Sequence, residues 1–172
     1  MISKKNRKNQ LLRLPILYVL FLFVVLGAVV GIVASKACNM EAFVTVGQGS
    51  LRSVIVSNAV YLIGVVLLSR IWFGFAAIPI VLFYKGFSIS AAVCVMLQIA
   101  EVDVMTIILR IGIPSALQMI GLLYISPIFI LVSIKRLKGC SMSTDDLTGM
   151  KRGVRNAGLW SVLSVISACV IY

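Results

Sequence analysis

The sequence predicts an all-α protein, a polytopic transmembrane helix bundle of about five spans with kinked or broken third and fourth helices. Hydrophobic residues make up 61% of the chain, charged residues only 12%, and the mean hydropathy is +1.12. Residues 14–34 contain no charged side chain, and about 20 apolar residues suffice to cross a hydrocarbon core roughly 30 Å thick. No long polar block interrupts residues 1–172, so we expect a single integral membrane domain.

The first span is predicted over residues 12–35. Its apolar run exceeds the core of roughly 7 to 15 residues that is typical of a signal peptide, so we expect an uncleaved anchor. Gly27 and Gly31 form a GxxxG motif, and Ser35 follows one turn later. Glycines four apart create a groove that lets another helix approach closely. Two interpretations are open: packing within the bundle, or an interface with a partner or a second copy.

A short polar loop over residues 36–52 separates this span from the second, predicted over residues 53–69. We expect the loop to face outward and to offer a surface for a partner protein.

The third and fourth spans are predicted over residues 71–100 and 104–134, each longer than one untilted crossing. Pro79 and Gly86 interrupt the former, and Pro114 interrupts the latter. Proline removes a backbone donor and glycine loosens a helix, so both favour a kink or a break. We expect a kinked or discontinuous helix in each stretch, and splitting of both would raise the number of crossings from five to seven.

Lys85 and Arg110 are the ionisable residues predicted to lie deepest in the membrane, where charged groups are costly and often functional. One interpretation pairs them with Glu101 and Asp103 in a polar cavity where broken helices meet. The other has both side chains reaching toward an interface and fixing a bend.

Residues 135–156 are predicted to form a polar cytoplasmic loop carrying a short interfacial helix, and residues 157–172 a short final span. Ser161, Ser164 and Ala168 give that span one face of small residues, which suits packing against the bundle.

The net charge of +11 comes mainly from Lys and Arg in residues 4–13 and 135–155. In a soluble protein this charge would suggest nucleic acid as a partner, but beside apolar spans it predicts cytoplasmic segments that contact anionic membrane lipids. With five crossings between them, the N-terminus is expected in the cytoplasm and the C-terminus outside the cell membrane.

The residue types do not predict an enzyme. The chain has no histidine, which removes the commonest general base and metal ligand, and its four cysteines are scattered. No GxxxxGK[ST] phosphate loop is present. We therefore expect no catalytic residues, no metal site and no cofactor.

The segment over residues 74–87 contains glycine, then Ile78-Pro79, then Lys85-Gly86-Phe87. It resembles the stage II sporulation protein M family, whose members carry a similar pattern at this place, and Ile113-Pro114 resembles the family's second proline region. The resemblance implies a membrane scaffold that organises peptidoglycan hydrolases, an amidase and a lytic transglycosylase, while the mother cell engulfs the forespore. The alternative to this scaffold function is a transporter or permease subunit that uses the broken helices as a substrate path. The glycine groove is also compatible with a homo-oligomer.

Overall fold

The computed structural model describes residues 4–37, 51–71, 73–99, 103–139 and 144–171, and within these ranges every regular element is helical. The elements are α1 (Lys4–Ala37), α2 (Leu51–Leu68), α3 (Gly74–Ile99), α4 (Val104–Ile107), the π-helical segment η2 (Ile108–Gly112), α5 (Ile113–Leu137) and α6 (Thr144–Ile171). The predicted all-α bundle is confirmed.

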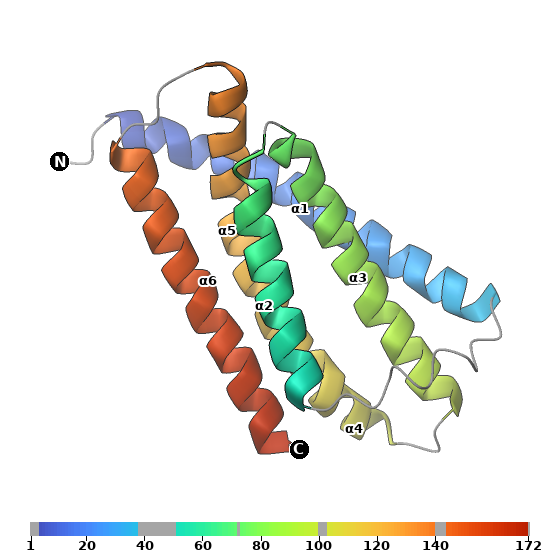
Figure 1. Ribbon diagram of the computed structural model, residues 1–172. Coiled ribbons are helices and arrows are strands. Elements are labelled where there is room, and N and C mark those ends of the chain that lie inside the picture. The colour runs from blue at the N-terminus through green and yellow to red at the C-terminus, as the bar shows by residue number, and fades with distance from the viewer. Residues whose placement is uncertain (1–3, 38–50, 72, 100–102, 140–143, 172) are drawn as a thin grey trace.

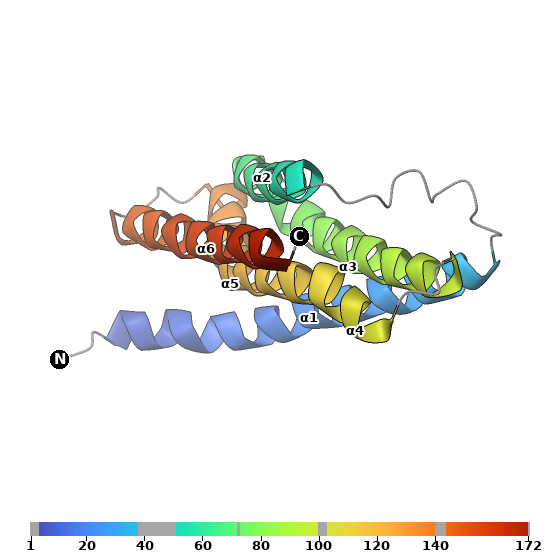
Figure 2. The same ribbon diagram turned by 90° about the horizontal axis from the view of Figure 1, so that it is seen from below.

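The long helices run alternately up and down, so the two termini lie at opposite ends of the bundle (Figure 1). Figure 2 shows α1 and α2 on opposite faces, with α3, α5 and α6 between them. Four helical runs are long and apolar enough to cross a membrane: Arg13–Ala37, Gly74–Gln98, Val104–Leu137 and Asp146–Val170. A shorter apolar stretch, Ala59–Leu68, lies in α2. The chain thus has the character of a multi-pass membrane protein.

The central helix is α5, which packs against α1, α2, α3 and α6. In the most apolar part of the candidate span Val104–Leu137, which contains α5, 67% of the residues are buried. The corresponding share is 17% to 22% in the other three candidate spans. Phe129 and Ile125 are completely buried there, among a cluster that includes Leu20 of α1, Val65 of α2 and Leu82 of α3. The outer helices instead expose most of their large apolar side chains, as lipid-facing helices do.

The last part of the chain differs from the prediction. In place of a loop over residues 135–156 and a short span from residue 157, α6 is one continuous helix of 28 residues that begins at Thr144. The charges suggested a loop, but Lys151 and Arg152 are exposed on one side of α6 while Gly153 is buried on the other. One amphipathic helix therefore accommodates the basic residues and the packing face together.

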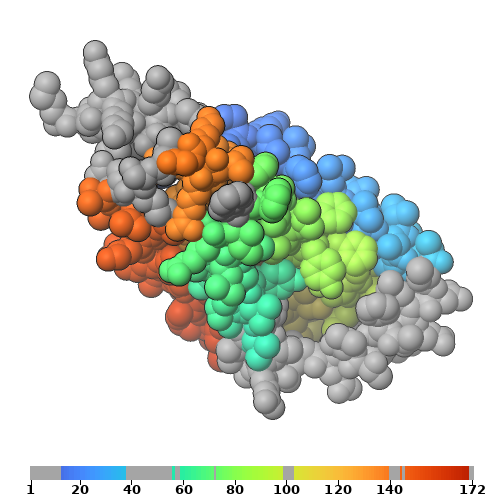
Figure 3. All heavy atoms as spheres, turned by 45° about the horizontal axis from the view of Figure 1, so that its top comes forward, coloured from blue at the N-terminus to red at the C-terminus, as the bar shows by residue number. Residues whose placement is uncertain are grey.

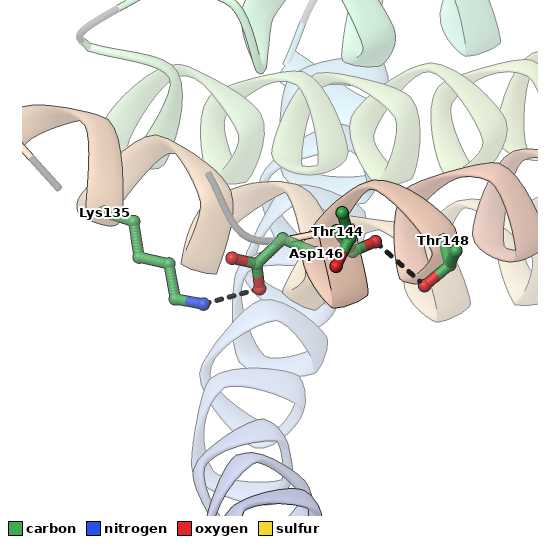
Figure 4. Close-up of polar contacts among 4 residues, drawn as sticks. All are labelled: Lys135, Thr144, Asp146 and Thr148. Atoms are coloured by element: carbon green, nitrogen blue, oxygen red, sulfur yellow. Dashed lines mark hydrogen bonds and ion pairs between the residues drawn. The ribbon is translucent and has the colours of Figure 1, made fainter. Parts of the chain in front are cut away.

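The connection between α5 and α6 is correspondingly short. α5 ends at Leu137, and Gly139 takes a φ of +67°, the left-handed conformation that favours glycine just after a helix end. Across the connection, the Lys135 ammonium pairs with the Asp146 carboxylate at 2.5 Å (Figure 4). Within the first turn of α6, the Thr148 hydroxyl donates to the Thr144 carbonyl at 3.1 Å.

The predicted discontinuity of the third stretch is wrong, because α3 continues through Pro79 from Gly74 to Ile99. The fourth stretch is also one helical run, so the chain does not reach seven crossings. Its irregularity is η2: the Ile113 N–H bonds the Ile108 carbonyl, a step of five residues, directly before Pro114. Because Pro114 has no N–H to donate to the Arg110 carbonyl, a shift in the hydrogen-bond register is the local response. A kink in either helix stays a prediction.

The C-terminal turn of α5 closes the turn between α2 and α3. The Ser133 hydroxyl donates to the Ile71 carbonyl at 3.1 Å, and the Arg136 guanidinium donates to the Arg70 carbonyl at 3.2 Å. Figure 3 brings this end forward and shows the end of α5, in orange, against the α2–α3 turn, in green. The two carbonyls belong to the turn that follows α2, and the Ile71 carbonyl also accepts from the Gly74 N–H at 3.0 Å.

Candidate functional site: a glycine-lined helix seam beside a buried lysine

The predicted helix-packing residues Gly27, Gly31 and Ser35 are all buried on α1 and lie four residues apart. A Cβ added to Gly27 would overlap the Phe83 carbonyl oxygen of α3, and one added to Gly31 would lie 2.6 Å from the Phe87 carbonyl oxygen. The two backbones are thus in direct contact. Of the two interpretations of the groove, this face serves packing inside the bundle.

The matching groove on α3 is formed by Gly86 and Ser90. A Cβ on Gly86 would overlap the Val24 carbonyl oxygen of α1. The Ser90 hydroxyl donates to the Gly86 carbonyl at 3.1 Å and to the Phe87 carbonyl at 3.0 Å, so its polar atom is satisfied within its own helix. We call these two grooves together the α1–α3 seam. The sequence analysis missed Ser90, although its spacing of four from Gly86 is a small-xxx-small signal.

Lys85 precedes Gly86 and points to a different neighbour. Its side chain is only 7% exposed, and its Nζ lies 4.3 Å from the centroid of the Tyr61 ring of α2. An ammonium at this distance over a ring face is attracted by the electron density of the ring. Lys85 is therefore enclosed by the bundle at mid-helix, rather than extended toward an interface.

The segment over residues 74–87 contacts three neighbours. At its start, a Cβ on Gly74 would overlap the Leu68 carbonyl oxygen of α2 and lie 2.9 Å from Ser133 Oγ of α5. At its end, Lys85 meets α2 and Gly86 meets α1. The Tyr84 and Phe87 rings stack beside them, with centroids 6.3 Å apart. We call this segment the three-helix joint. Pro79, predicted to belong to a broken-helix core, is half-buried within it.

The remaining predicted core residues do not converge on Lys85. Arg110 is exposed on η2, whereas Lys85 is buried against Tyr61, so the two do not line one enclosed cavity. Pro114 is buried, and its carbonyl accepts a hydrogen bond from the Ser164 hydroxyl of α6 at 2.7 Å. Asp103 is exposed at the start of α4, and Glu101 lies outside the described residues.

A second close contact joins α5 and α6. A Cβ on Gly121 would lie 2.9 Å from Trp160 Cβ, and one on Gly153 would lie 3.0 Å from Ile128 Cδ1. Ser164 and Ala168 are fully buried, as their predicted packing face requires, and Ser161 is half-buried. Gly153 and Ala157 extend the same face toward the start of α6. The sequence analysis missed Gly153 because it began the last span at residue 157, and it did not assign Ala157 to the packing face.

One buried polar group stands out on α5. Gln118 is 4% exposed, and its Nε2 has no hydrogen-bond partner within the described part of the chain. The buried hydroxyls of Ser126, Ser133 and Ser164 all donate to carbonyls. Among the described residues, no group of three His, Cys, Asp or Glu side chains is placed to hold a metal ion. The contacts described between these helices are those of close helix association.

The predicted partner surface over residues 36–52 falls mostly on residues 38–50, which lie outside the described residues. Comparison with protein-family models, with curated proteins and with solved structures finds no match to this chain.

Proposed function

We propose that this chain is a non-enzymatic integral membrane scaffold, resembling stage II sporulation protein M, that organises peptidoglycan hydrolases during forespore engulfment. The observation that carries the proposal is the three-helix joint. The residues that bear the resemblance, from Gly74 to the Lys85-Gly86 pair, are those that hold α3 against α1, α2 and α5.

A scaffold needs a bundle whose ends keep a fixed spacing, so that loops and termini present partners reproducibly. Backbone contact at Gly27 and Gly86 supports such rigidity, because helices in contact along their backbones have little freedom to slide. The central position of α5, with neighbours on every side, supports it as well.

We further place the N-terminus in the cytoplasm and the C-terminus outside the cell membrane. The support is the clustering of basic residues near the N-terminus and around the α5–α6 connection, which is the pattern of cytoplasmic segments. Paired reporter fusions at Tyr172, one active only outside the membrane and one only inside, test the orientation. Activity of the inside reporter would contradict the proposal.

The scaffold is tested by purifying the tagged chain in mild detergent from sporulating cells and identifying the wall hydrolases that accompany it. Gly31→Leu should remove them, since its side chain has no space against the Phe87 carbonyl. Val30→Leu is the matched control, because Val30 is 45% exposed on the outer side of α1 and tolerates an added methylene. Replacing residues 36–52 tests the loop directly.

Recovery of the chain without any hydrolase, together with normal engulfment in cells that lack the chain, would argue against the scaffold. The alternative of a transporter or permease subunit is then tested in proteoliposomes. Substrate flux that disappears in Arg110→Ala would favour it, because Arg110 is the exposed cation on the π-helical segment.

A further inference from the structure

Basic residues gather at one end of the bundle. Eight of them lie near the start of the α1 and α6 spans, or at or just after the ends of α2 and α5. They are Arg13, Arg70, Lys135, Arg136, Lys138, Lys151, Arg152 and Arg155. The acids in the same segments are Asp145 and Asp146, and Asp146 is engaged by Lys135. At the opposite end, the cations with described side chains are Lys36 and Arg110.

Three of these cations gather where the end of α5 meets the α2–α3 turn, and we call them the basic patch: Arg70, Arg136 and Lys138. Arg136 donates to the Arg70 carbonyl at 3.2 Å, so these two residues are adjacent although they are far apart in the chain.

The patch lies at the depth of lipid headgroups. Arg13 opens the first candidate span, Gly74 opens the second directly after the α2–α3 turn, and Leu137 ends the third. Guanidinium groups bind phosphate oxygens through paired N–H donors, which suits them to phosphodiester headgroups.

We propose that the basic patch is a binding site for anionic phospholipid headgroups of one membrane leaflet. Arg70 and Lys138 contact the phosphates, and Arg136 positions Arg70 by donating to its carbonyl. The site depends on the charges and the fold alone, so it stands whether or not the chain organises hydrolases.

The test uses the purified full chain in mild detergent, titrated with phosphatidylglycerol, with zwitterionic phosphatidylcholine and with inorganic phosphate, with binding followed by native mass spectrometry. Arg70→Gln with Lys138→Gln removes two exposed cations from the patch. Lys36→Gln with Arg110→Gln is the matched control, because it removes two exposed cations from the opposite end and changes the net charge equally.

Wild type should bind phosphatidylglycerol in preference to phosphatidylcholine. The patch variant should lose affinity about 25-fold, at roughly fivefold for each cation near an anionic surface, and the control should keep its affinity. Raising the ionic strength should weaken binding in wild type. Thermal unfolding of both variants in the same detergent shows whether each is folded, and the single substitutions repeat the comparison if the double variant is not.

Equal losses in the two double variants would mean that net charge alone attracts lipid, and would overturn the site. Unchanged binding in the patch variant would overturn it as well. Displacement of phosphatidylglycerol by millimolar inorganic phosphate would show that the patch takes free phosphate, and would overturn the assignment to lipid.

Discussion

The Lys85 ammonium of α3 lies 4.3 Å from the centroid of the Tyr61 ring of α2. This contact joins α3 to α2. The α1–α3 seam holds α3 tightly against α1, whereas α2 has only a short apolar stretch, Ala59–Leu68. A desolvated cation over an aromatic face contributes about 2 kcal/mol or more, whereas an exposed one contributes about 0.5–1 kcal/mol. Lys85 is thus one of the contacts that hold α2, which also packs against α5 and α6.

A double-mutant cycle tests this attachment. Tyr61→Phe keeps the ring and should change stability little, whereas Tyr61→Leu removes the ring and should lower the free energy of unfolding by about 1–2 kcal/mol. In a Lys85→Met background the difference between the two Tyr61 variants should nearly vanish, because no cation remains to be attracted. Thermal unfolding in detergent measures all four variants. The same difference in both backgrounds would contradict a direct contact.

The α1–α3 seam predicts opposite effects for two glycine-to-alanine changes. Gly27→Ala places a methyl group on the Phe83 carbonyl and should destabilise the chain by about 1–3 kcal/mol. Gly64→Ala is the control, since nothing lies within 4 Å of its added Cβ. Alanine is the better helix former, so Gly64→Ala should stabilise α2 by about 0.5–1 kcal/mol. Apparent melting temperatures that move in the same direction would contradict the seam.

The hydrogen bond from Ser164 to the Pro114 carbonyl predicts a smaller effect at the α5–α6 contact. Ser164→Ala removes a fully buried donor at 2.7 Å and should cost about 0.6–1.7 kcal/mol, the range for hydrogen bonds between transmembrane helices. Ser161→Ala, at a half-buried position on the preceding turn, should change the melting temperature much less. Equal effects at both positions would mean that the loss of volume matters and the bond does not.

The ion pair between Lys135 and Asp146 should be weak and sensitive to salt. The two side chains are 37% and 15% exposed, and ion pairs near the surface contribute about 0.2–1 kcal/mol. Asp146→Asn should lower stability within that range at low ionic strength and by almost nothing in 1 M salt, where charges are screened within a few ångströms. Exchange of the two residues, Lys135→Asp with Asp146→Lys, should restore the loss. A salt-independent effect would point to packing at Asp146 instead.

The helical class was predictable because apolar runs of membrane length have few other solutions in lipid. The glycine groove on α1 was also predictable from Gly27 and Gly31. Which helix fills that groove was not, since α3 meets it through the carbonyls of Phe83 and Phe87, and a backbone carbonyl carries no sequence signal. Gly86 and Ser90 offered the only hint.

The start of α6 and the surroundings of Lys85 were beyond sequence reasoning for different reasons. The consecutive charges of Lys151 and Arg152 indicated a loop, whereas in the structure both residues lie on the exposed side of a helix that buries Gly153. The burial of Lys85 depends on Tyr61 from another helix, and that pairing arises only when α2 packs against α3. The expected break at Pro79 failed because helices continue past a single missing donor when their neighbours hold them in place.

The position of α5 has a consequence for biogenesis. The ribosome reaches Ile113 only after α1, α2 and α3 have been made, yet α5 is the neighbour that all three share. The α2–α3 turn likewise gains its hydrogen bonds from Ser133 and Arg136 only after α5 has been synthesised. The packing partner that α1, α2 and α3 share is therefore added only with the second half of the chain.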